Sequence, residues 1–346
     1  MGPGSMQLFF YDYYLIDWLS MKLCTFIPEQ DPRNSQPQLG LFADPQTLID
    51  LREAFSTLTL GSLPLDMISL IKEWPKYQPL LEQILNAHSA RSLPTSALPS
   101  LKSVQLLSPI PRPVSMRDGY TFRQHVEAAR RNRGVPMIPE FDQFPVFYFT
   151  NALSVTGPGE VFVHPAAMEK LDYELEVAIV IGYGGRNIPA SRADEHIFGY
   201  MILNDWSARA LQMEEMKLNL GPAKGKDFAN SLGPWLVTRD ELAPFAIPGP
   251  SGERHNLRMR AWVGDRLLSE GNLNDMSWTF AQLVERASQG VRLEAGEVIG
   301  SGTVGTGCLL ELNGSKITDN LWLKAGDKVR MEVQALGVLE NTVVLD

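Results

Sequence analysis

The sequence is poor in the residues that define several common classes of protein. It has two cysteines, Cys24 and Cys308, too few and too far apart for a disulfide scaffold, which predicts reduced thiols in a cytoplasmic protein. Acidic residues outnumber basic ones by 40 to 31, and the formal net charge of −9 argues against nucleic acid or an anionic membrane as the main partner. An anionic small molecule stays compatible with this charge, because a site can be locally basic inside an acidic protein.

Long apolar runs are also missing. The most apolar stretch near the N-terminus, residues 7–19, is aromatic, is interrupted by Asp12 and Asp17, and is too short to span a bilayer. It lacks the basic region and the small-residue cleavage site of a signal peptide. We expect this aromatic extension, residues 6–20, to dock on the body of the protein or on a second subunit. Residues 1–5, Met-Gly-Pro-Gly-Ser, look like an expression remnant.

The composition is that of a folded protein with a sizeable core, since 44% of the residues are hydrophobic and 21% are charged. Residues 91–112 are rich in Ser, Pro and Leu and indicate a linker. We therefore expect a small N-terminal α/β domain at 21–104 and a larger catalytic domain at 105–346. Short strand patterns with many Gly and Pro residues predict a β-dominated α+β structure for the larger domain, rather than alternating βαβ units.

Hydrophobic periodicity predicts most elements of secondary structure. The smaller domain shows strand patterns at 21–26 and 40–51 and helical spacing at 64–90. In the larger domain the predicted strands are 161–163, 175–181, 198–203, 236–238, 257–263, 308–312 and 329–333. The predicted helices are 124–131, 207–216 and 277–287.

The segment 171–182 carries the first candidate site. Its apolar residues alternate from 175 to 181, so Glu174 and Glu176 share the opposite side of the strand, with Cα atoms about 6.5–7 Å apart. That side also continues with apolar residues. Unpaired buried carboxylates are costly, so a cation is their natural companion. The alternatives are a solvated start of the strand or a pair of salt bridges.

Two further acids strengthen the metal hypothesis. Asp205 ends the next strand pattern, directly before Ser207, a predicted helix N-cap, and strand ends commonly present catalytic groups. Asp118 lies in a predicted turn before the helix at 124–131. Four carboxylates without a Cys or His cluster predict a hard cation with oxygen ligands, which is Mg²⁺, Mn²⁺ or Ca²⁺ rather than zinc.

His125 is the candidate general base, since an imidazole titrates near neutral pH. It follows Asp118 by seven residues and is one of only five histidines in the chain. The alternative is an ordinary histidine on a helix surface. His196, in contrast, is predicted to be structural.

Cationic and polar residues follow the acids. Arg209 and Gln212 are three positions apart and share a helix face beside Asp205. Lys226 lies in a glycine-containing loop that would present its ammonium group. Each of these residues is otherwise an ordinary surface residue. The Gly-rich loop at 300–307 is neither a P-loop nor a dinucleotide fingerprint, and we expect it to cradle a carboxylate.

Taken together, these segments resemble the fumarylacetoacetate hydrolase superfamily. The resemblance covers roughly residues 21–345 and is closer to the fumarylacetoacetase-type hydrolases than to the smaller decarboxylase and isomerase members. The similar segments are the Glu-x-Glu strand at 171–182, the signature His-Ile-Phe-Gly-Tyr-Met-Ile-Leu-Asn-Asp-Trp-Ser-Ala-Arg at 196–209, Gly-Lys-Asp-Phe at 225–228, Gly-Ser-Gly-Thr at 300–303 and the start of the N-terminal domain at 21–26.

The resemblance implies a mixed β-roll catalytic domain, a homodimer and a divalent metal ion, either Mg²⁺ or Ca²⁺ or Mn²⁺. The implied metal ligands are Asp118, Glu174, Glu176 and Asp205. The implied water-activating pair is His125 with Glu311, which lies in the predicted strand 308–312. The implied oxyanion-stabilising residues are Arg209, Gln212 and Lys226. The residues implied to hold the substrate's carboxylate are Tyr120, Arg133, Tyr148 and Thr303.

The resemblance also implies a reaction, the hydrolysis of a carbon–carbon bond in a small anionic 2,4-diketo acid that is similar to fumarylacetoacetate or an acylpyruvate. A 1,3-dicarbonyl is cleaved when water adds to one carbonyl and the leaving carbon departs as an enolate, which suits a base, an oxyanion site and a Lewis acid. One alternative is a lyase or isomerase that decarboxylates, dehydrates or tautomerises a 2-keto acid through a metal enolate. Another is a binding protein without turnover.

Overall fold

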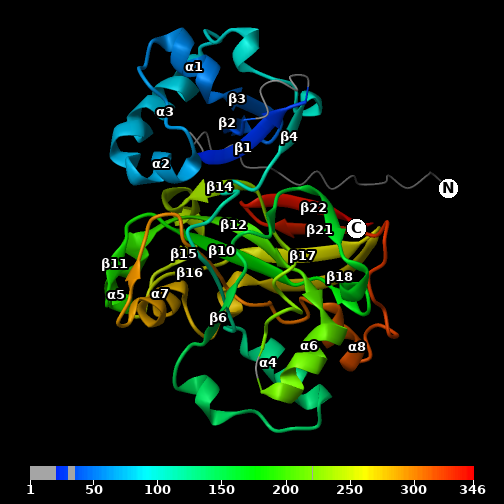
Figure 1. Ribbon diagram of the computed structural model, residues 1–346. Coiled ribbons are helices and arrows are strands. Elements are labelled where there is room, and N and C mark those ends of the chain that lie inside the picture. Colours follow the sequence, from blue (N-terminus) through cyan, green and yellow to red (C-terminus); the bar gives the residue numbers. More distant parts are fainter. Residues whose placement is uncertain (1–20, 30–35, 220) are drawn as a thin grey trace, which may run out of the picture.

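The computed structural model describes residues 21–29, 36–219 and 221–346, so the aromatic extension predicted at 6–20 lies outside it. Figure 1 shows a smaller part with several helices, built from the beginning of the chain, above a larger β-rich part. The predicted α+β class with dominant β-structure is confirmed by two large sheets. Among the described residues, no helix has the length and apolar character needed to cross a membrane.

The smaller part is an antiparallel meander followed by helices. Its strands are β1 (Lys22–Pro28), β2 (Gln38–Asp44) and β3 (Thr47–Asp50), with β4 (Val104–Leu106) returning beside β1. Its helices are α1 (Leu51–Leu58), α2 (Met67–Lys72) and α3 (Trp74–Ser89). The Asp50 carboxylate caps α1 by accepting the Arg52 amide at 2.8 Å, and Asp66 caps α2 by accepting the Ser69 amide. The helical spacing predicted over 64–90 is thereby confirmed.

Strand β1 joins the two parts of the molecule, because it pairs with β14 of the larger part. The main sheet therefore runs in the order β3-β2-β1-β14-β12-β10-β20-β5-β6. Its strands from the larger part are β14 (Asn230–Thr238), β12 (Ile197–Asp205), β10 (Leu175–Ile181), β20 (Val298–Gly300), β5 (Met116–Gly119) and β6 (Phe147–Thr150). The helices of the smaller part lie on one face of this sheet, where Ala178 and Met201 share a buried cluster with Leu81 of α3.

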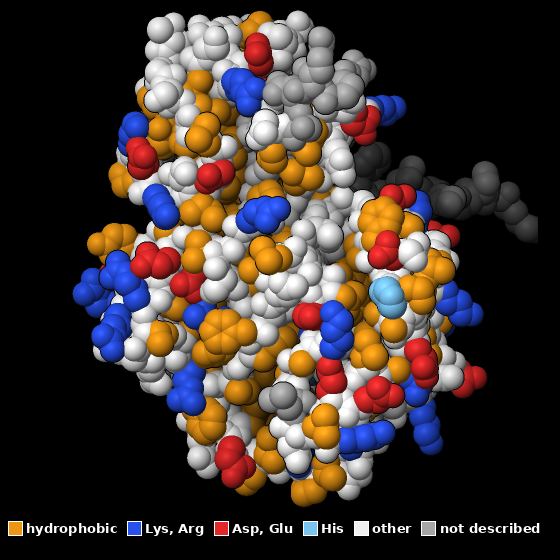
Figure 2. Space-filling model, viewed as in Figure 1, with side chains coloured by type: hydrophobic (Ala, Val, Ile, Leu, Met, Phe, Trp, Pro, Cys, Tyr) orange, Lys and Arg blue, Asp and Glu red, His pale blue; other side chains and the backbone are white. Residues whose placement is uncertain are grey.

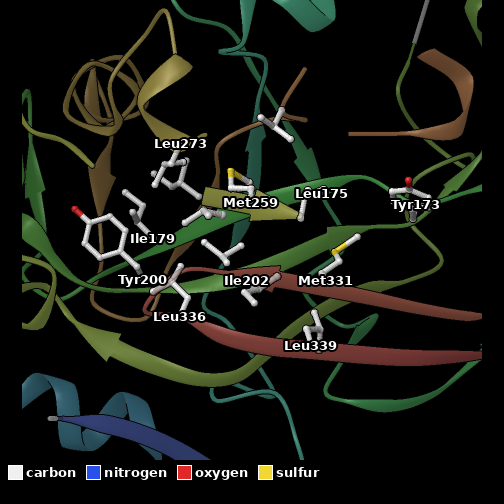
Figure 3. Close-up of a cluster of buried hydrophobic side chains, with 14 of the residues drawn as sticks. Tyr173, Leu175, Ile179, Tyr200, Ile202, Met259, Leu273, Met331, Leu336 and Leu339 are labelled. Atoms are coloured by element: carbon white, nitrogen blue, oxygen red, sulfur yellow. The ribbon is translucent and has the colours of Figure 1, made fainter. Parts of the chain in front are cut away.

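The opposite face of the main sheet belongs to a second buried cluster, which it shares with a five-stranded sheet in the order β18-β17-β21-β22-β8. Figure 3 shows Ile179 and Ile202 of the main sheet together with Met259 and Met331 of the second. The strands of the second sheet are β18 (Arg266–Asn272), β17 (Arg258–Val263), β21 (Lys328–Val333), β22 (Gly337–Leu345) and β8 (Gly159–Val163). Strand β10 is thus covered on both sides, which explains why every residue of it is buried, Glu176 included.

Helices and short strand pairs complete the larger part. The helices are α4 (Arg123–Asn132), α5 (Ala190–Ala193), α6 (Arg209–Glu215), α7 (Phe280–Ser288) and α8 (Leu309–Gly314). The short strands are β7 (Val155–Thr156), β9 (Leu171–Asp172), β11 (Gly185–Arg186), β13 (Ser207–Ala208), β15 (Ala246–Ile247), β16 (Arg254–His255) and β19 (Arg292–Leu293). Figure 1 places α4, α6 and α8 together at the lower end of the molecule.

Three local predictions are wrong. The strand predicted at 308–312 is α8, because Leu309 and Leu312 bury themselves at helical spacing, and a short apolar run does not distinguish strand from helix. Ser207 does not cap a helix: it pairs with β9 in β13, and α6 begins at Arg209. Asp118 lies in β5, paired with β20 and β6, rather than in a turn.

The charged groups on the surface are mixed in sign. Figure 2 shows Lys and Arg side chains gathered at the left edge, over β11 and α5, with acidic groups spread across the rest of this face. Arg192 of α5 is exposed there and pairs with Glu195 at 2.9 Å. These surface charges are separate from the buried cations Arg209 and Lys226, which are only 3% and 4% exposed.

Candidate active site

Four carboxylates from neighbouring strands meet inside the larger part of the molecule. Each of Asp118, Glu174, Glu176 and Asp205 offers an oxygen, and these oxygens all lie within 4.8 Å of one another. The register brings them together, because Leu175 pairs with Asn204 and Asp118 pairs with Gly300 of the intervening strand β20. A side chain at position 300 would collide with the carboxylate of Asp118, since a Cβ there would meet Oδ1 at 2.2 Å.

Buried cations balance part of this negative charge. The Lys226 ammonium donates to Glu174 and to Asp205, and the Arg209 Nη2 donates to Glu174 Oε1 at 2.7 Å. Burial favours the neutral form of Glu174, yet Lys226 and Arg209 together hold its pKa below the usual range. Asp205 shows the opposite balance: burial outweighs Lys226 and raises its pKa to about 8.

Glu176 and Asp118 face each other without a full set of counter-charges. Burial, followed by the neighbouring Asp118, raises the pKa of Glu176 well above its usual value, and burial also raises the pKa of Asp118. Asp205 Oδ1 is buried and finds no hydrogen-bond partner among the described residues. A buried set of four carboxylates with an unused oxygen fits a hard divalent cation, for which Mg²⁺, Mn²⁺ and Ca²⁺ are the suitable ions.

The Gly-rich loop holds two of these carboxylates. The amide of Gly302 donates to Asp118 Oδ1 at 3.1 Å and to Glu176 Oε2 at 3.0 Å, and Thr303 Oγ1 donates to Glu176 Oε1 at 3.3 Å. Gly302 has a φ of +79°, and a Cβ there would meet the carbonyl oxygen of Gly119 at 2.6 Å, so a larger residue would be excluded. The loop therefore cradles carboxylates of the protein itself.

A histidine–carboxylate pair lies beside this cluster. His125 Nδ1, on α4, is 2.8 Å from Glu311 Oε2, on α8, and both side chains are almost fully buried. The other oxygen of Glu311 accepts the Thr306 amide at 3.0 Å. A carboxylate at Nδ1 selects the tautomer with the proton there, which leaves Nε2 as a free base. His125 lies close to Glu174, so that its protonated form would help Lys226 and Arg209 to lower the pKa of that carboxyl.

Asp172 is a site residue that the sequence analysis did not single out. Its Oδ2 accepts Arg209 Nε at 2.8 Å and the Leu310 amide at 3.0 Å, and its Oδ1 accepts the Leu309 amide at 2.6 Å. It therefore connects the guanidinium group beside Glu174 to the first turn of α8. Its position two residues before Glu174, on the same side of the alternation, is the signal that could have identified it.

The remaining predicted site residues differ in how they contact the carboxylate cluster. Gln212 Oε1 accepts Arg209 Nη1 at 3.0 Å, so the predicted helix face is formed. Tyr148 Oη donates to Asp205 Oδ2 at 2.5 Å. Tyr120 is half-buried with its ring edge-on to His125, and burial raises its pKa to about 12. Arg133 ends α4 at the surface, where its Nε donates to the Ala129 carbonyl.

His196 lies at the opposite end of β12 from Asp205 and the other carboxylates. It directly precedes β12, whereas Asp205 ends that strand. Its Nδ1 is 2.6 Å from the Tyr183 carbonyl oxygen, and its own carbonyl accepts the Gly182 amide at 2.8 Å. These contacts fit the structural role predicted for it.

Comparison with known proteins agrees with this geometry. The family model described as fumarylacetoacetate (FAA) hydrolase, C-terminal, matches residues 115–344. Oxaloacetate tautomerase YisK of Bacillus subtilis is 30% identical over 313 residues, which are 88% of this chain and 95% of that protein. Fumarylacetoacetase of Oryza sativa subsp. japonica is 30% identical over 299 residues, which are 70% of this chain and 68% of that protein.

A solved structure extends the similarity to the whole fold. The fumarylacetoacetate hydrolase from psychrophilic Exiguobacterium antarcticum is 25% identical, with a TM-score of 0.66, and the match covers 94% of this chain and 100% of that one. The fold and the site thus define an enzyme whose four buried carboxylates could hold a divalent metal ion. The chain belongs to the fumarylacetoacetate hydrolase family. Its relatives include both hydrolases and tautomerases.

Proposed function

We propose that this enzyme hydrolyses a carbon–carbon bond in a small 2,4-diketo acid that is similar to fumarylacetoacetate or an acylpyruvate. The observation that carries the proposal is the contact of 2.8 Å between His125 and Glu311, buried beside the four carboxylates. Hydrolysis needs a base that takes a proton from water, and enolisation of a keto acid needs a base that takes a proton from carbon. A base held by its own carboxylate partner is the arrangement that water activation uses.

In this proposal His125 removes the proton from water at Nε2. Glu311 holds the Nδ1 proton and stabilises the imidazolium that forms, as the carboxylate of a catalytic triad does. The Thr306 amide keeps Glu311 in place through its second oxygen. The attacking hydroxide thereby forms next to the substrate carbonyl, in a site from which bulk water is largely excluded.

The buried cations stabilise the negative charge that develops on the carbonyl oxygen. Arg209 and Lys226 both donate to Glu174. The side-chain oxygen of Gln212 accepts from Arg209, which leaves the NH₂ group of Gln212 to donate to a substrate oxygen. Burial lowers the pKa of Lys226, whereas the neighbouring acids Asp205 and Glu174 raise it. The acids prevail, so Lys226 stays charged. Asp118, Glu174, Glu176 and Asp205 would hold a divalent ion, which would supply Lewis-acid stabilisation of negative charge on the substrate.

Substrate binding is proposed for the hydroxyl and cationic residues near the carboxylates. Tyr120 would orient the carboxylate of the diketo acid through its hydroxyl group. Tyr148 and Thr303 would do so after exchanging their hydrogen bonds to Asp205 and Glu176 for bonds to the substrate. Arg133 would add a positive charge after turning inward from the end of α4. Its influence already reaches the Tyr120 hydroxyl, where it opposes the rise in pKa that burial causes.

A tautomerase or isomerase is the second candidate function. It is supported by the oxaloacetate tautomerase of Bacillus subtilis, which aligns with 88% of this chain. In that case His125 would exchange a proton with carbon rather than with water, and the metal ion and the cations would serve the same enolate. A lyase that decarboxylates or dehydrates a 2-keto acid would use these groups in a similar way.

One experiment separates these functions. Purified protein with Mg²⁺ is offered fumaryl-, maleyl- and acetyl-substituted diketo acids, and oxaloacetate, in water enriched in oxygen-18. Hydrolysis predicts loss of the near-ultraviolet absorbance of a diketo acid and one labelled oxygen in a product carboxylate. Turnover of oxaloacetate alone, with no labelled cleavage product across the panel, would exclude the hydrolase proposal and favour the tautomerase.

We also propose Mg²⁺ as the resident ion and a homodimer as the assembly, in a cytoplasmic setting. The dimer is supported by the edge strand β6, where Phe149 is 63% exposed, and by Leu153 nearby, which is 77% exposed. Exposed apolar groups on an unpaired edge are typical of a surface that another chain covers. Light scattering of Phe149→Asp and of the unmodified protein tests this, and an unchanged dimeric mass would exclude this edge as the interface.

A further inference from the structure

Cys308 lies next to the proposed base and has no part in the proposed reaction. It directly precedes α8, and its backbone forms a bridge with Glu174. One ring nitrogen of His125, the Cys308 sulfur and a carboxylate oxygen of Glu311 all lie within 4.8 Å of one another. The three side chains are buried, with exposed fractions of 6%, 0% and 4%. A thiol, an imidazole and a carboxylate therefore converge on one point beside the catalytic cluster.

These three groups form a different kind of ligand set from the four carboxylates. Thiolate and imidazole suit zinc and related transition ions, whereas an all-oxygen set suits Mg²⁺ or Ca²⁺. Zinc–nitrogen and zinc–oxygen distances of about 2.0–2.1 Å and a zinc–sulfur distance of about 2.3 Å place tetrahedral ligand atoms roughly 3.3–3.6 Å apart. The His125–Glu311 contact would need to open from 2.8 Å, and a contact as long as 4.8 Å would need to close by at most about 1.5 Å to reach this spacing.

We propose that His125, Cys308 and Glu311 form a second metal site, which binds Zn²⁺ and thereby inhibits the enzyme. On binding, a zinc–sulfur bond forms and the Cys308 thiol releases one proton to solvent, while neutral His125 and ionised Glu311 supply lone pairs. Either ring nitrogen as ligand disables the base, since Nε2 accepts the proton from water and Nδ1 is the atom that Glu311 holds. The inhibition rests on the proposed function of His125, whereas the metal site itself does not.

Kinetics distinguish this site from the catalytic one. Zinc that displaces Mg²⁺ from the four carboxylates is relieved by adding Mg²⁺, but zinc at the second site is not. With saturating Mg²⁺ we expect inhibition by Zn²⁺ that further Mg²⁺ does not relieve. Cys308→Ser should keep the basal rate and raise the zinc concentration for half-inhibition at least about tenfold, since even residues outside the ligand shell cost 10–100-fold in metal affinity.

The matched control is the other cysteine of the chain. Cys24 is also buried, but it lies in β1 of the smaller part of the molecule. Cys24→Ala should be inhibited by zinc at the same concentration as the unmodified protein. Equal inhibition of Cys308→Ser and the unmodified protein would overturn the proposal.

Metal binding is also measured without any turnover. In Mg²⁺-saturated protein, Co²⁺ should produce a thiolate-to-cobalt charge-transfer band in the near ultraviolet, which Cys24→Ala retains and Cys308→Ser loses. If Cys308→Ser does not fold, the band in Cys24→Ala still assigns the thiolate to Cys308. No band in either protein overturns the second site, even where hydrolysis is demonstrated. A band without hydrolysis leaves the site standing and rejects only the proposed function.

Discussion

The four carboxylates and the His125–Glu311 pair lie in one site but come from different kinds of structure. The carboxylates stand on, or directly before, strands of the main sheet, at positions set by strand register. His125 and Glu311 stand on α4 and α8, 186 positions apart in the chain, and meet only because these helices pack together. Metal binding is thus built into the sheet, whereas proton transfer depends on how two helices dock on it.

Metal binding and proton transfer can therefore be separated by mutation. Asp172 is the main connection between them, since it binds both Arg209, beside Glu174, and the first amides of α8. A variant of a strand carboxylate should abolish metal binding and leave the helix pair in place. A variant of the helix pair should do the reverse.

The largest effect is expected from Glu176→Gln. Loss of one charged ligand should weaken Mg²⁺ binding strongly and lower kcat/KM by about 10⁴-fold, because the Lewis acid contributes several kcal/mol. The metal-free variant should nevertheless melt at a higher temperature than the metal-free unmodified protein, since Glu176 faces Asp118 without a sufficient counter-charge. Calorimetric titration with Mg²⁺ and thermal melts measure both effects. Unchanged Mg²⁺ affinity would remove Glu176 from the metal site.

The helix half is tested by His125→Ala. Loss of the base should lower kcat by about 10²–10⁴-fold, and Mg²⁺ affinity should stay within about twofold of the original. Glu311→Gln should give a smaller loss of kcat, because the imidazole keeps its place but loses the charge that stabilises the imidazolium. An unchanged hydrolysis rate in His125→Ala would show that water is activated elsewhere.

Asp172→Asn should affect both halves moderately. An amide group in place of the carboxylate faces donors from Arg209, Leu309 and Leu310, so one of them is left unpaired. We expect kcat to fall by about tenfold with little change in KM, and stability to fall by about 1–3 kcal/mol. Steady-state kinetics and denaturant unfolding give the two values. A loss of stability with normal kcat would reduce Asp172 to a structural role.

The pH dependence of stability should differ between the metal-free and the Mg²⁺-bound protein. Asp205 has a pKa of about 8 in the folded protein, above the ordinary value of 3.8, because of burial. Its neutral form therefore contributes stability that is complete below pH 4 and is lost as the pH rises toward 8, by at most about 1.4 kcal/mol per pH unit for one proton. Mg²⁺ binds the ionised form, so the rise in melting temperature on adding Mg²⁺ should grow from pH 5 to pH 8. An equal rise at both pH values would contradict this assignment.

The smallest effect is expected from Thr306→Gly. Thr306 has a φ of +65°, a conformation that a β-branched residue rarely adopts, and its backbone amide holds Glu311. Glycine keeps that amide and relieves the strain, so stability should change by less than about 1 kcal/mol and kcat by less than about twofold. A larger loss of kcat would show that the hydroxyl group, which donates to the Glu270 carbonyl, is needed as well.

Much of the fold follows from local pattern. The alternation at 175–181 predicted β10 to the residue, and helical spacing predicted α4 and α7 to within a few positions. The error at 308–312 has a physical reason: in five residues, helical and extended patterns are both compatible with two buried leucines. Asp172, 137 positions away, stabilises the start of this helix, because its carboxylate accepts the first amides of α8.

For the site, the sequence determined the chemical types and the short-range geometry. Glu174 and Glu176 share one side of a strand because strand periodicity is two, and Arg209 and Gln212 share a helix face because they are three apart. Those relations hold wherever the elements are placed, so composition and spacing already indicate an acidic, hard-metal site with cations beside it.

Only the tertiary structure decided how the parts meet. The order β12-β10-β20-β5 brings Asp205 and Asp118 to the same pair of glutamates, and the packing of α8 brings Glu311 to His125. The position of Arg133 at the surface and the convergence of Cys308 with His125 are also results of packing. Such contacts join residues that are far apart in the chain, and local periodicity carries no information about the distances between such residues in the fold.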